Sequence, residues 1–195
     1  MGDLLLVRHG QTEWSRTHRH TGRTDVALTP YGERQAASLA PVLAGRQLAA
    51  VWTSPLQRAR HTGRLAGLRP QVDDDLVEWD NGHYEGLTTA QIREQRPGWW
   101  LWTDGAPGGE SWEQVAARCE RTLRRVAPGL EQGDVVLFGH GHSLRALAAT
   151  WVGLSAWQGG IFTQDEASLS ILGVYRGHQV VMSWNDVGAH PQEAA

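Results

Sequence analysis

Short, largely hydrophobic runs recur along the chain at residues 4–7, 50–53 and 135–138. An apolar run without polar alternation is typical of a strand buried on both faces of a sheet. These runs therefore predict strands of a covered, parallel sheet. Further extended segments are predicted at residues 72–78, 168–174 and 179–184, the last two joined at Arg176-Gly177 as a terminal hairpin or a pair of edge strands.

Helix signals follow these runs. Thr29-Pro30 and Ser54-Pro55 each place a capping side chain before a proline at the first helical position. Ser111 and Gln114 have the spacing of a capping box, which predicts the start of a third helix. Helices are predicted from 30 to about 44, from 55 to about 66, from 88 to 95, from 111 onward and from 143 to 152, with residues 9–28 as a polar loop.

Strands that alternate with helices predict a three-layer α/β/α sandwich with a mainly parallel central sheet. The 195 residues suffice for one domain with a sizeable core, and we expect a single domain over residues 1–195. No internal repeat or low-complexity segment interrupts the pattern.

Charge and composition restrict the function. The formal net charge of −3 predicts no general attraction to nucleic acid or to an anionic membrane. All 18 basic residues are Arg, so any fixed cation that binds an anionic ligand must be a guanidinium. The single cysteine, Cys119, allows no internal disulfide, and residues 1–8 lack the pattern of a signal peptide. We therefore expect a soluble, cytoplasmic protein, and a homodimer is one arrangement that the sequence leaves open.

The residues with catalytic potential follow predicted strands. Arg8-His9-Gly10 follows the first strand, His140-Gly141 follows the strand at 135–138, and Arg58 lies one turn into the helix after residues 50–53. Ligands of open α/β sheets bind at the carboxyl ends of the strands, so these residues are expected to meet at one edge.

This set fits phosphoryl transfer. The reaction needs a nucleophile, positive charge on the phosphoryl oxygens and an acid for the leaving oxygen. An imidazole is a nucleophile near neutral pH, and guanidinium groups bind phosphate through paired hydrogen bonds. Backbone N–H groups near Gly141 at a helix N-terminus are expected to add donors. Glu78, after the third extended segment, is the best-placed acid, and we expect burial to raise its pKa.

The residues 6–14, LVRHGQTEW, resemble the signature of the histidine phosphatase superfamily, which includes phosphoglycerate mutases. The resemblance continues in order through residues 28–32, 53–59, 78–86 and 139–141, and so spans most of the chain. It implies the same sandwich fold and a phosphohistidine intermediate. Further matches at residues 72–79, 102–105 and 140–145 resemble a phosphatase branch that includes sedoheptulose-1,7-bisphosphatase and small acid phosphatases, which implies a sugar phosphate or bisphosphate as substrate.

The resemblance assigns a role to each matching residue. It makes His9 the phosphorylated nucleophile and Glu78 the proton donor and acceptor. Thr21 and Gly22 are expected to contact the substrate. The phosphate pocket is expected to contain Arg8, His9, Arg58, His140 and Gly141.

Three points remain open in the sequence. Many family members have Asn where this chain has Ser15, whose hydroxyl could still donate to phosphate. Glu85 is a rival to Glu78 for the acid. The Trp-rich segment 99–102 is either a lid over the site or core packing beneath a loop.

We expect no cofactor and no metal. His18-x-His20 and His140-x-His142 could suggest a metal site, but no Cys or carboxylate cluster accompanies them at ligand spacing.

The expected partner is a small phosphate ester, hydrolysed by water. A mutase is the first alternative, although mutases of the family are longer and cover the site with a C-terminal tail. A binding module that holds a phosphorylated ligand is the second, although such modules usually lack the His or the acid.

Overall fold

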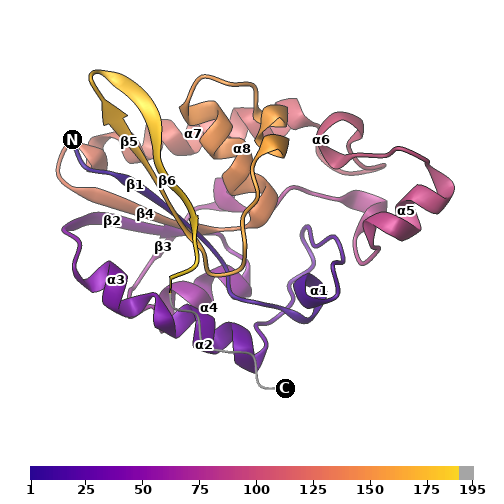
Figure 1. The fold of residues 1–195 in the computed structure, drawn as a ribbon, viewed down its shortest axis with the longest axis horizontal. Helices are drawn as coiled ribbons and strands as arrows, with labels where there is room; N and C mark the ends of the chain where they lie inside the picture. Colours follow the sequence, from indigo (N-terminus) through magenta and orange to yellow (C-terminus); the bar gives the residue numbers. More distant parts are fainter. Residues whose placement is uncertain (189–195) are drawn as a thin grey trace.

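The computed structural model describes residues 1–188 and has a six-stranded sheet at its centre, in the order β3-β2-β4-β1-β5-β6 (Figure 1). β1 pairs in parallel with β4, which pairs in parallel with β2. β5 runs antiparallel to β1 and carries β6 as an antiparallel edge strand. The strands are β1 (Leu4–Arg8), β2 (Leu48–Thr53), β3 (Gln71–Val72), β4 (Asp134–Gly139), β5 (Leu169–Tyr175) and β6 (His178–Asp186).

Helices cover both faces of the sheet, which confirms the predicted three-layer sandwich (Figure 1). The group α2–α4 lies on one face, and α7 and α8 lie on the other. The α-helices are α1 (Glu13–Arg16), α2 (Pro30–Ser38), α3 (Ala40–Ala44), α4 (Gln57–Leu65), α5 (Thr89–Gln95), α6 (Leu101–Asp104), α7 (Trp112–Leu130) and α8 (Gly141–Trp151), with short 3-10 helices at η1 (Asp74–Leu76), η2 (Gly82–Tyr84) and η3 (Ala156–Ile161).

The apolar run of β1 supplies both cores. Leu4 and Leu6 pack into the cluster under α7 and α8, whereas Leu5 and Val7 pack into the cluster under α2–α4. All four side chains are fully buried. Successive strand residues point to opposite faces, so an unbroken apolar run is what a sheet covered on both sides requires.

Two predicted elements are wrong in extent. The helix expected from 30 to 44 is divided into α2 and α3, because Pro41 has no N–H to donate to the preceding turn. The extended segment expected at 72–78 ends after Val72. Asp73 then caps the 3-10 turn η1 by accepting a hydrogen bond from the backbone N–H of Asp75.

The helix predicted after Ser54-Pro55 is present as α4, but it begins at Gln57 with Leu56 as its N-cap, so the predicted cap by Ser54 is wrong. Other predicted elements are confirmed. The Ser111 capping box begins α7, and β5 and β6 form the terminal hairpin around Arg176 and Gly177, which both have positive φ. The helices α1 and α6 were not predicted, and each spans only four residues. Within residues 1–188, no helix is both long and apolar enough to cross a membrane.

Candidate active site

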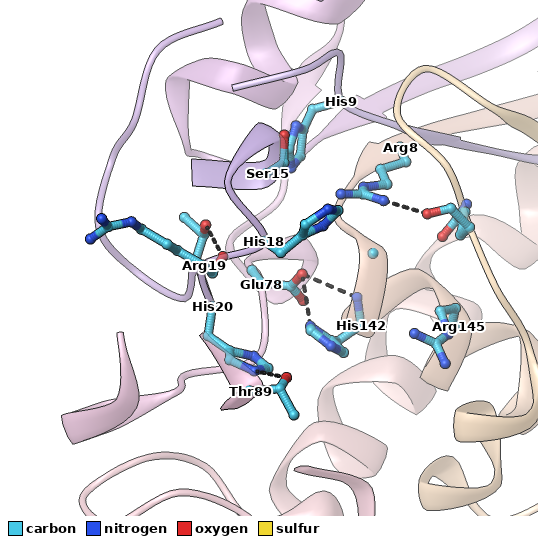
Figure 2. A pocket seen from close by; sticks show the side chains of 13 residues that line it. Arg8, His9, Ser15, His18, Arg19, His20, Glu78, Thr89, His142 and Arg145 are labelled. Atoms are coloured by element: carbon cyan, nitrogen blue, oxygen red, sulfur yellow. Dashed lines mark hydrogen bonds and ion pairs between the residues drawn. The ribbon is translucent and has the colours of Figure 1, made fainter. Parts of the chain in front are cut away.

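A cavity of about 240 Å³ opens at the carboxyl ends of β1 and β4 (Figure 2). Basic and imidazole side chains dominate its wall, and Glu78 contributes a carboxylate. The lining residues are Arg8, His9, Ser15, His18, Arg19, His20, Thr21, Glu78, Thr89, Gly141, His142, Arg145 and Gln164.

His9 follows β1 directly, and its backbone N–H donates to the carbonyl of Gly139 at the end of β4. The imidazole Nδ1 lies 2.7 Å from the carbonyl oxygen of Gly10. A carbonyl oxygen only accepts, so Nδ1 carries the proton and Nε2 keeps its lone pair. Burial, reinforced by the positive charges of Arg58 and Arg8, holds the pKa of His9 well below its usual value. His9 is therefore a neutral imidazole with one nucleophilic nitrogen.

The geometry of His9 is maintained because the backbone of the loop after β1 packs closely against α2 and α4. The N–H of Gly10 donates to Oγ1 of Thr62 on α4 at 3.0 Å. A Cβ at position 10 would lie 2.3 Å from the carbonyl oxygen of Gly32 in α2. Only glycine allows the chain to pass there, which fixes the direction in which His9 leaves the strand.

Arg58 and His140 lie behind His9 as a fully buried pair. Nε of Arg58 donates to Nδ1 of His140 at 3.1 Å, so His140 is neutral and its Nε2–H donates to Oγ of Ser54 at 2.7 Å. The rings of His9 and His140 are 5.2 Å apart between centroids. The structure thus places His140 beside the expected nucleophile, with both of its ring nitrogens bonded inside the protein.

The guanidinium of Arg58 also holds the loop that follows α1. Its Nη1 donates to the carbonyl of Thr24 and its Nη2 to the carbonyl of Gly22, both at 2.9 Å. Burial lowers the pKa of Arg58 to about 10, which still leaves it charged at neutral pH. Its positive charge therefore acts on the pocket from behind the residues that line it.

Arg8 lies in the pocket wall itself. Its guanidinium donates to the backbone carbonyl of Gln164 and, at 3.3 Å, to the carboxylate of Glu166. An added Cβ at Gly141 would lie 3.4 Å from Nε of Arg8, so the start of α8 packs against this guanidinium. Arg8, His9 and Gly141 thus share one corner of the cavity.

Glu78 faces the cavity between His9 and Arg145 (Figure 2), and its ionisation differs from expectation. Its Oε1 accepts from the backbone N–H groups of Trp79 at 2.7 Å and Ser143 at 2.8 Å. Its Oε2 accepts from the N–H of His142 at 3.1 Å. Burial raises the pKa of Glu78, but the contact with the His142 side chain, 3.5 Å away, and the hydrogen bond from the backbone N–H of Trp79 outweigh burial and hold the pKa well below its usual value. The expected raised pKa is therefore wrong for the free protein, since the first turn of α8 binds the carboxylate form.

Glu85, the other candidate for the general acid, instead holds the loop at Arg23 and Thr24. It accepts from the backbone N–H of Arg23 and from both the N–H and the hydroxyl of Thr24, and it is not among the cavity-lining residues. Gly22 lies in the same loop, where an added Cβ would approach Oε1 of Glu85 to 2.3 Å. The structure therefore places Gly22 as a support of Arg58, whereas Thr21 lines the cavity.

The hydroxyl of Ser15 lines the cavity but is engaged in the cap of α1. It accepts from the N–H of Thr12 at 2.9 Å and donates to the carbonyl of Thr12 at 3.1 Å. The donor that the sequence suggested for phosphate is thus already used in the described structure.

Two of the three tryptophans in the segment 99–102 belong to the hydrophobic core and do not form a lid over the site. Trp99 and Trp102 are each 2% exposed, and only Trp100 is exposed. Trp99 packs edge-on against His20, and Trp102 packs against His142, with 5.2 and 5.7 Å between ring centroids. Trp99 and Trp102 thus pack behind His20 and His142 in the cavity wall and hold their rings in place.

Three wall residues had no individual signal in the sequence, namely Arg19, Thr89 and Gln164. His18 and His20 drew attention only as possible metal ligands, and Arg145 only as part of the match at residues 140–145. His20 contacts Oγ1 of Thr89 at 3.0 Å, and burial together with His142 lowers the pKa of His20 to about 4. Across residues 1–188, no group of three or more His, Cys, Asp or Glu side chains has the arrangement of a metal site.

Comparison with known proteins identifies the family. Residues 4–187 match the histidine phosphatase superfamily (branch 1). An acid phosphatase of Mycobacterium tuberculosis is 42% identical, over 98% of this chain and 96% of that protein. The sedoheptulose 1,7-bisphosphatase of Saccharomyces cerevisiae is 39% identical, over 77% of this chain and 67% of that protein. The solved structure of a mycobacterial glucosyl-3-phosphoglycerate phosphatase with VO3 has a TM-score of 0.84 at 32% identity, covering 95% of this chain and all (100%) of that chain. The chain belongs to the histidine phosphatase superfamily and is a phosphomonoesterase of the histidine phosphatase type.

Proposed function

We propose that the protein hydrolyses a small phosphorylated metabolite, a sugar phosphate or bisphosphate, through a phosphohistidine on His9. The observation that carries the proposal is the ionisation of His9. Its Nδ1–H is fixed on the Gly10 carbonyl, and burial and two guanidinium groups keep the ring neutral. The free lone pair on Nε2 is what attack on phosphorus requires.

In the first step, the Nε2 lone pair forms a bond to phosphorus while the ester P–O bond breaks. The electron pair of that bond goes to the leaving oxygen, which takes a proton from Glu78. Arg8 in the wall and Arg58 behind it offset the charge on the phosphoryl oxygens. Glu78 is ionised in the free protein, and the arriving phosphate raises its pKa by repulsion between negative charges, which supplies the required protonated form.

In the second step, water attacks the phosphorus of the phosphohistidine and the P–N bond breaks. The carboxylate of Glu78 accepts the water proton, and His9 returns to its neutral form as inorganic phosphate is released. Glu78 is thus protonated again after the second step, as it was before the leaving oxygen took its proton, and it loses this proton to solvent as phosphate leaves and its pKa falls back to that of the free protein.

The substrate class is supported by the relatives. Two of them are named for sedoheptulose 1,7-bisphosphate and for glucosyl-3-phosphoglycerate, which are both phosphorylated carbohydrate derivatives. The cavity wall combines cationic and neutral polar groups, as recognition of a phosphorylated polyol requires.

Substitution of His9 tests the proposal. His9→Ala should abolish hydrolysis of p-nitrophenyl phosphate and remove acid-labile phosphate labelling of the protein. His61, partly exposed on α4 and outside the cavity lining, provides the control, and His61→Ala should retain both. Turnover by a folded His9→Ala protein would rule out His9 as the nucleophile. Labelling without release of phosphate to water would favour a mutase, and substrate binding without labelling would favour a binding module.

We also propose a single domain over residues 1–195 that acts in the cytoplasm on a soluble substrate, without nucleic acid or membrane partners. The net charge of −3 and the single, buried Cys119 support this. A homodimer stays a prediction, which sedimentation of the purified protein would decide.

A further inference from the structure

The cavity extends well beyond the corner that holds His9. In Figure 2, His9 and Ser15 lie at one end and Arg145 lies at the other, with Glu78 and His142 between them. A phosphoryl group bound at His9 therefore leaves Arg145 facing the remainder of the substrate.

Arg145 is a partly buried cation held only by neutral groups. It projects from α8, its guanidinium carbon lies 4.7 Å from the centre of the Trp102 ring, and its Nε and Nη2 each donate at 3.2 Å to the carbonyls of Gly159 and Gly160. Within residues 1–188, no carboxylate lies within 4.0 Å of its guanidinium. Burial lowers the pKa of Arg145 to about 10, so the group is charged at neutral pH.

Two other shielded guanidinium groups differ from Arg145 in this respect, whereas Arg58, behind His9, also lacks a carboxylate within 4.0 Å among the described residues. Arg8 and Arg118 have the carboxylates of Glu166 and Glu110 at 3.3 and 3.1 Å, respectively. A shielded charge without a counterion is costly, so proteins usually pair it. At Arg145 the open side is the cavity, and an anionic ligand would supply the missing partner.

A second observation places unused hydrogen-bonding capacity in the same cavity wall. Gln164 is 5% exposed, and neither Nε2 nor Oε1 of its side chain has a hydrogen-bond partner. Buried amides are nearly always satisfied, so an unpartnered one in a ligand cavity indicates a contact that a bound molecule completes.

We propose that Arg145 binds a second anionic group of the substrate, a phosphate or a carboxylate, while the phosphoryl group to be transferred lies at His9. The inference rests on the proposed function and narrows its substrate class to esters that carry two anionic groups. Glu78 lies between these two positions, so the second anion also favours the protonated acid that an alkoxide leaving group needs.

Two matched pairs of substrates test this. Glycerol 3-phosphate and 3-phosphoglycerate share a three-carbon skeleton but differ by a carboxylate, and fructose 6-phosphate and fructose 1,6-bisphosphate differ by a phosphate. We expect the protein to prefer the two-anion member of at least one pair, measured as a ratio of kcat/KM. Arg145→Met, which retains apolar contact with Trp102, should reduce that ratio roughly 10- to 100-fold, the range for loss of a hydrogen bond to a charged group.

Arg145→Lys should give an intermediate ratio, because it keeps the charge and loses the planar fork. It also keeps the test decisive if the Met variant does not fold, as judged by near-UV circular dichroism. The matched control is Arg124→Met on the exposed face of α7, which removes the same charge and should leave both ratios at the wild-type value.

The outcomes separate the inference from the proposed function. Equal kcat/KM within both pairs, or an unchanged ratio in folded Arg145 variants, would overturn the second anion site while hydrolysis on His9 stands. Absence of any ester hydrolysis and of phosphate labelling of His9 would overturn both. The pair whose ratio falls identifies the second group as phosphate or carboxylate.

Discussion

Nε of Arg58 donates a hydrogen bond to Nδ1 of His140 across 3.1 Å, and this contact joins α4 to the end of β4 directly behind the nucleophile. Because a guanidinium always donates, it fixes His140 as the acceptor and sets its tautomer. The same guanidinium binds the carbonyls of Gly22 and Thr24, so one side chain orders a histidine and a loop of the site.

Arg58→Lys should therefore impair both catalysis and stability. An ammonium cannot reach His140 and both carbonyls in the fork geometry of Arg. We expect kcat/KM to fall roughly 10²- to 10³-fold, the range for loss of one preorganised donor. The free energy of unfolding should fall by about 1–3 kcal/mol for the buried acceptor that is left unpaired.

Urea denaturation and steady-state kinetics on the same preparations measure the two effects. Arg60→Lys, at an exposed position of the same helix, is the control and should match the wild type in both. A fully active Arg58→Lys protein would show that the buried fork is dispensable.

Glu78→Gln should separate esters by leaving group. A sugar alkoxide needs a proton as its bond to phosphorus breaks, whereas a nitrophenolate is stable without one. Burst-phase phosphorylation of His9 by a sugar phosphate should slow roughly 10²- to 10⁴-fold, the usual size of a general-acid contribution, with a much smaller effect on p-nitrophenyl phosphate.

Glu85→Gln is the comparison for that experiment. Glu85 holds the loop at Arg23 and Thr24, so its substitution should affect both esters to the same extent. Selective loss with Glu85→Gln and uniform loss with Glu78→Gln would exchange the roles assigned to the two carboxylates.

The histidines of the site predict how stability depends on pH. Burial lowers the pKa of His9 and His140 in the folded protein, and the pKa of His20 falls to about 4 from 6.5. Below pH 6.5 the unfolded chain therefore binds protons that the folded protein does not. The free energy of unfolding should be highest above pH 6.5 and decline as the pH falls, with His20 contributing about 3 kcal/mol by pH 4.

His20→Gln isolates this contribution. Urea denaturation from pH 7 to pH 4 should show a shallower decline in this variant than in the wild type. His61→Gln replaces a partly exposed histidine outside the site and should keep the wild-type slope. Identical slopes for all three proteins would mean that His20 titrates alike in the folded and unfolded states.

The sequence predicted the layers of the fold because its signals there are local. Unbroken apolar runs and capping residues are set by nearby chain chemistry, and the strand ends then place Arg8 and His9 beside the segment after β4. The break between α2 and α3 could also have been predicted from the sequence, because Pro41 directly precludes a continuous helix.

The residues that line the cavity at its Arg145 end could not be predicted from local sequence signals. Arg145 faces the cavity because of its register on α8 and the path of η3, and Gln164 reaches it from a loop without a repeating pattern. The ionisation of Glu78 also depends on three backbone N–H groups, whose direction is set by tertiary structure and not by residue type.

The position of β1 in the sheet has a consequence for biosynthesis. β1 lies between β4 and β5, and Leu4 pairs with Val135 on one side and Leu172 on the other. During synthesis β1 thus emerges long before either neighbour exists, and its apolar run remains unpaired until β4 and β5 have been made. His9 directly follows β1, so it gains its surroundings in the site only after β4 and β5 have been made.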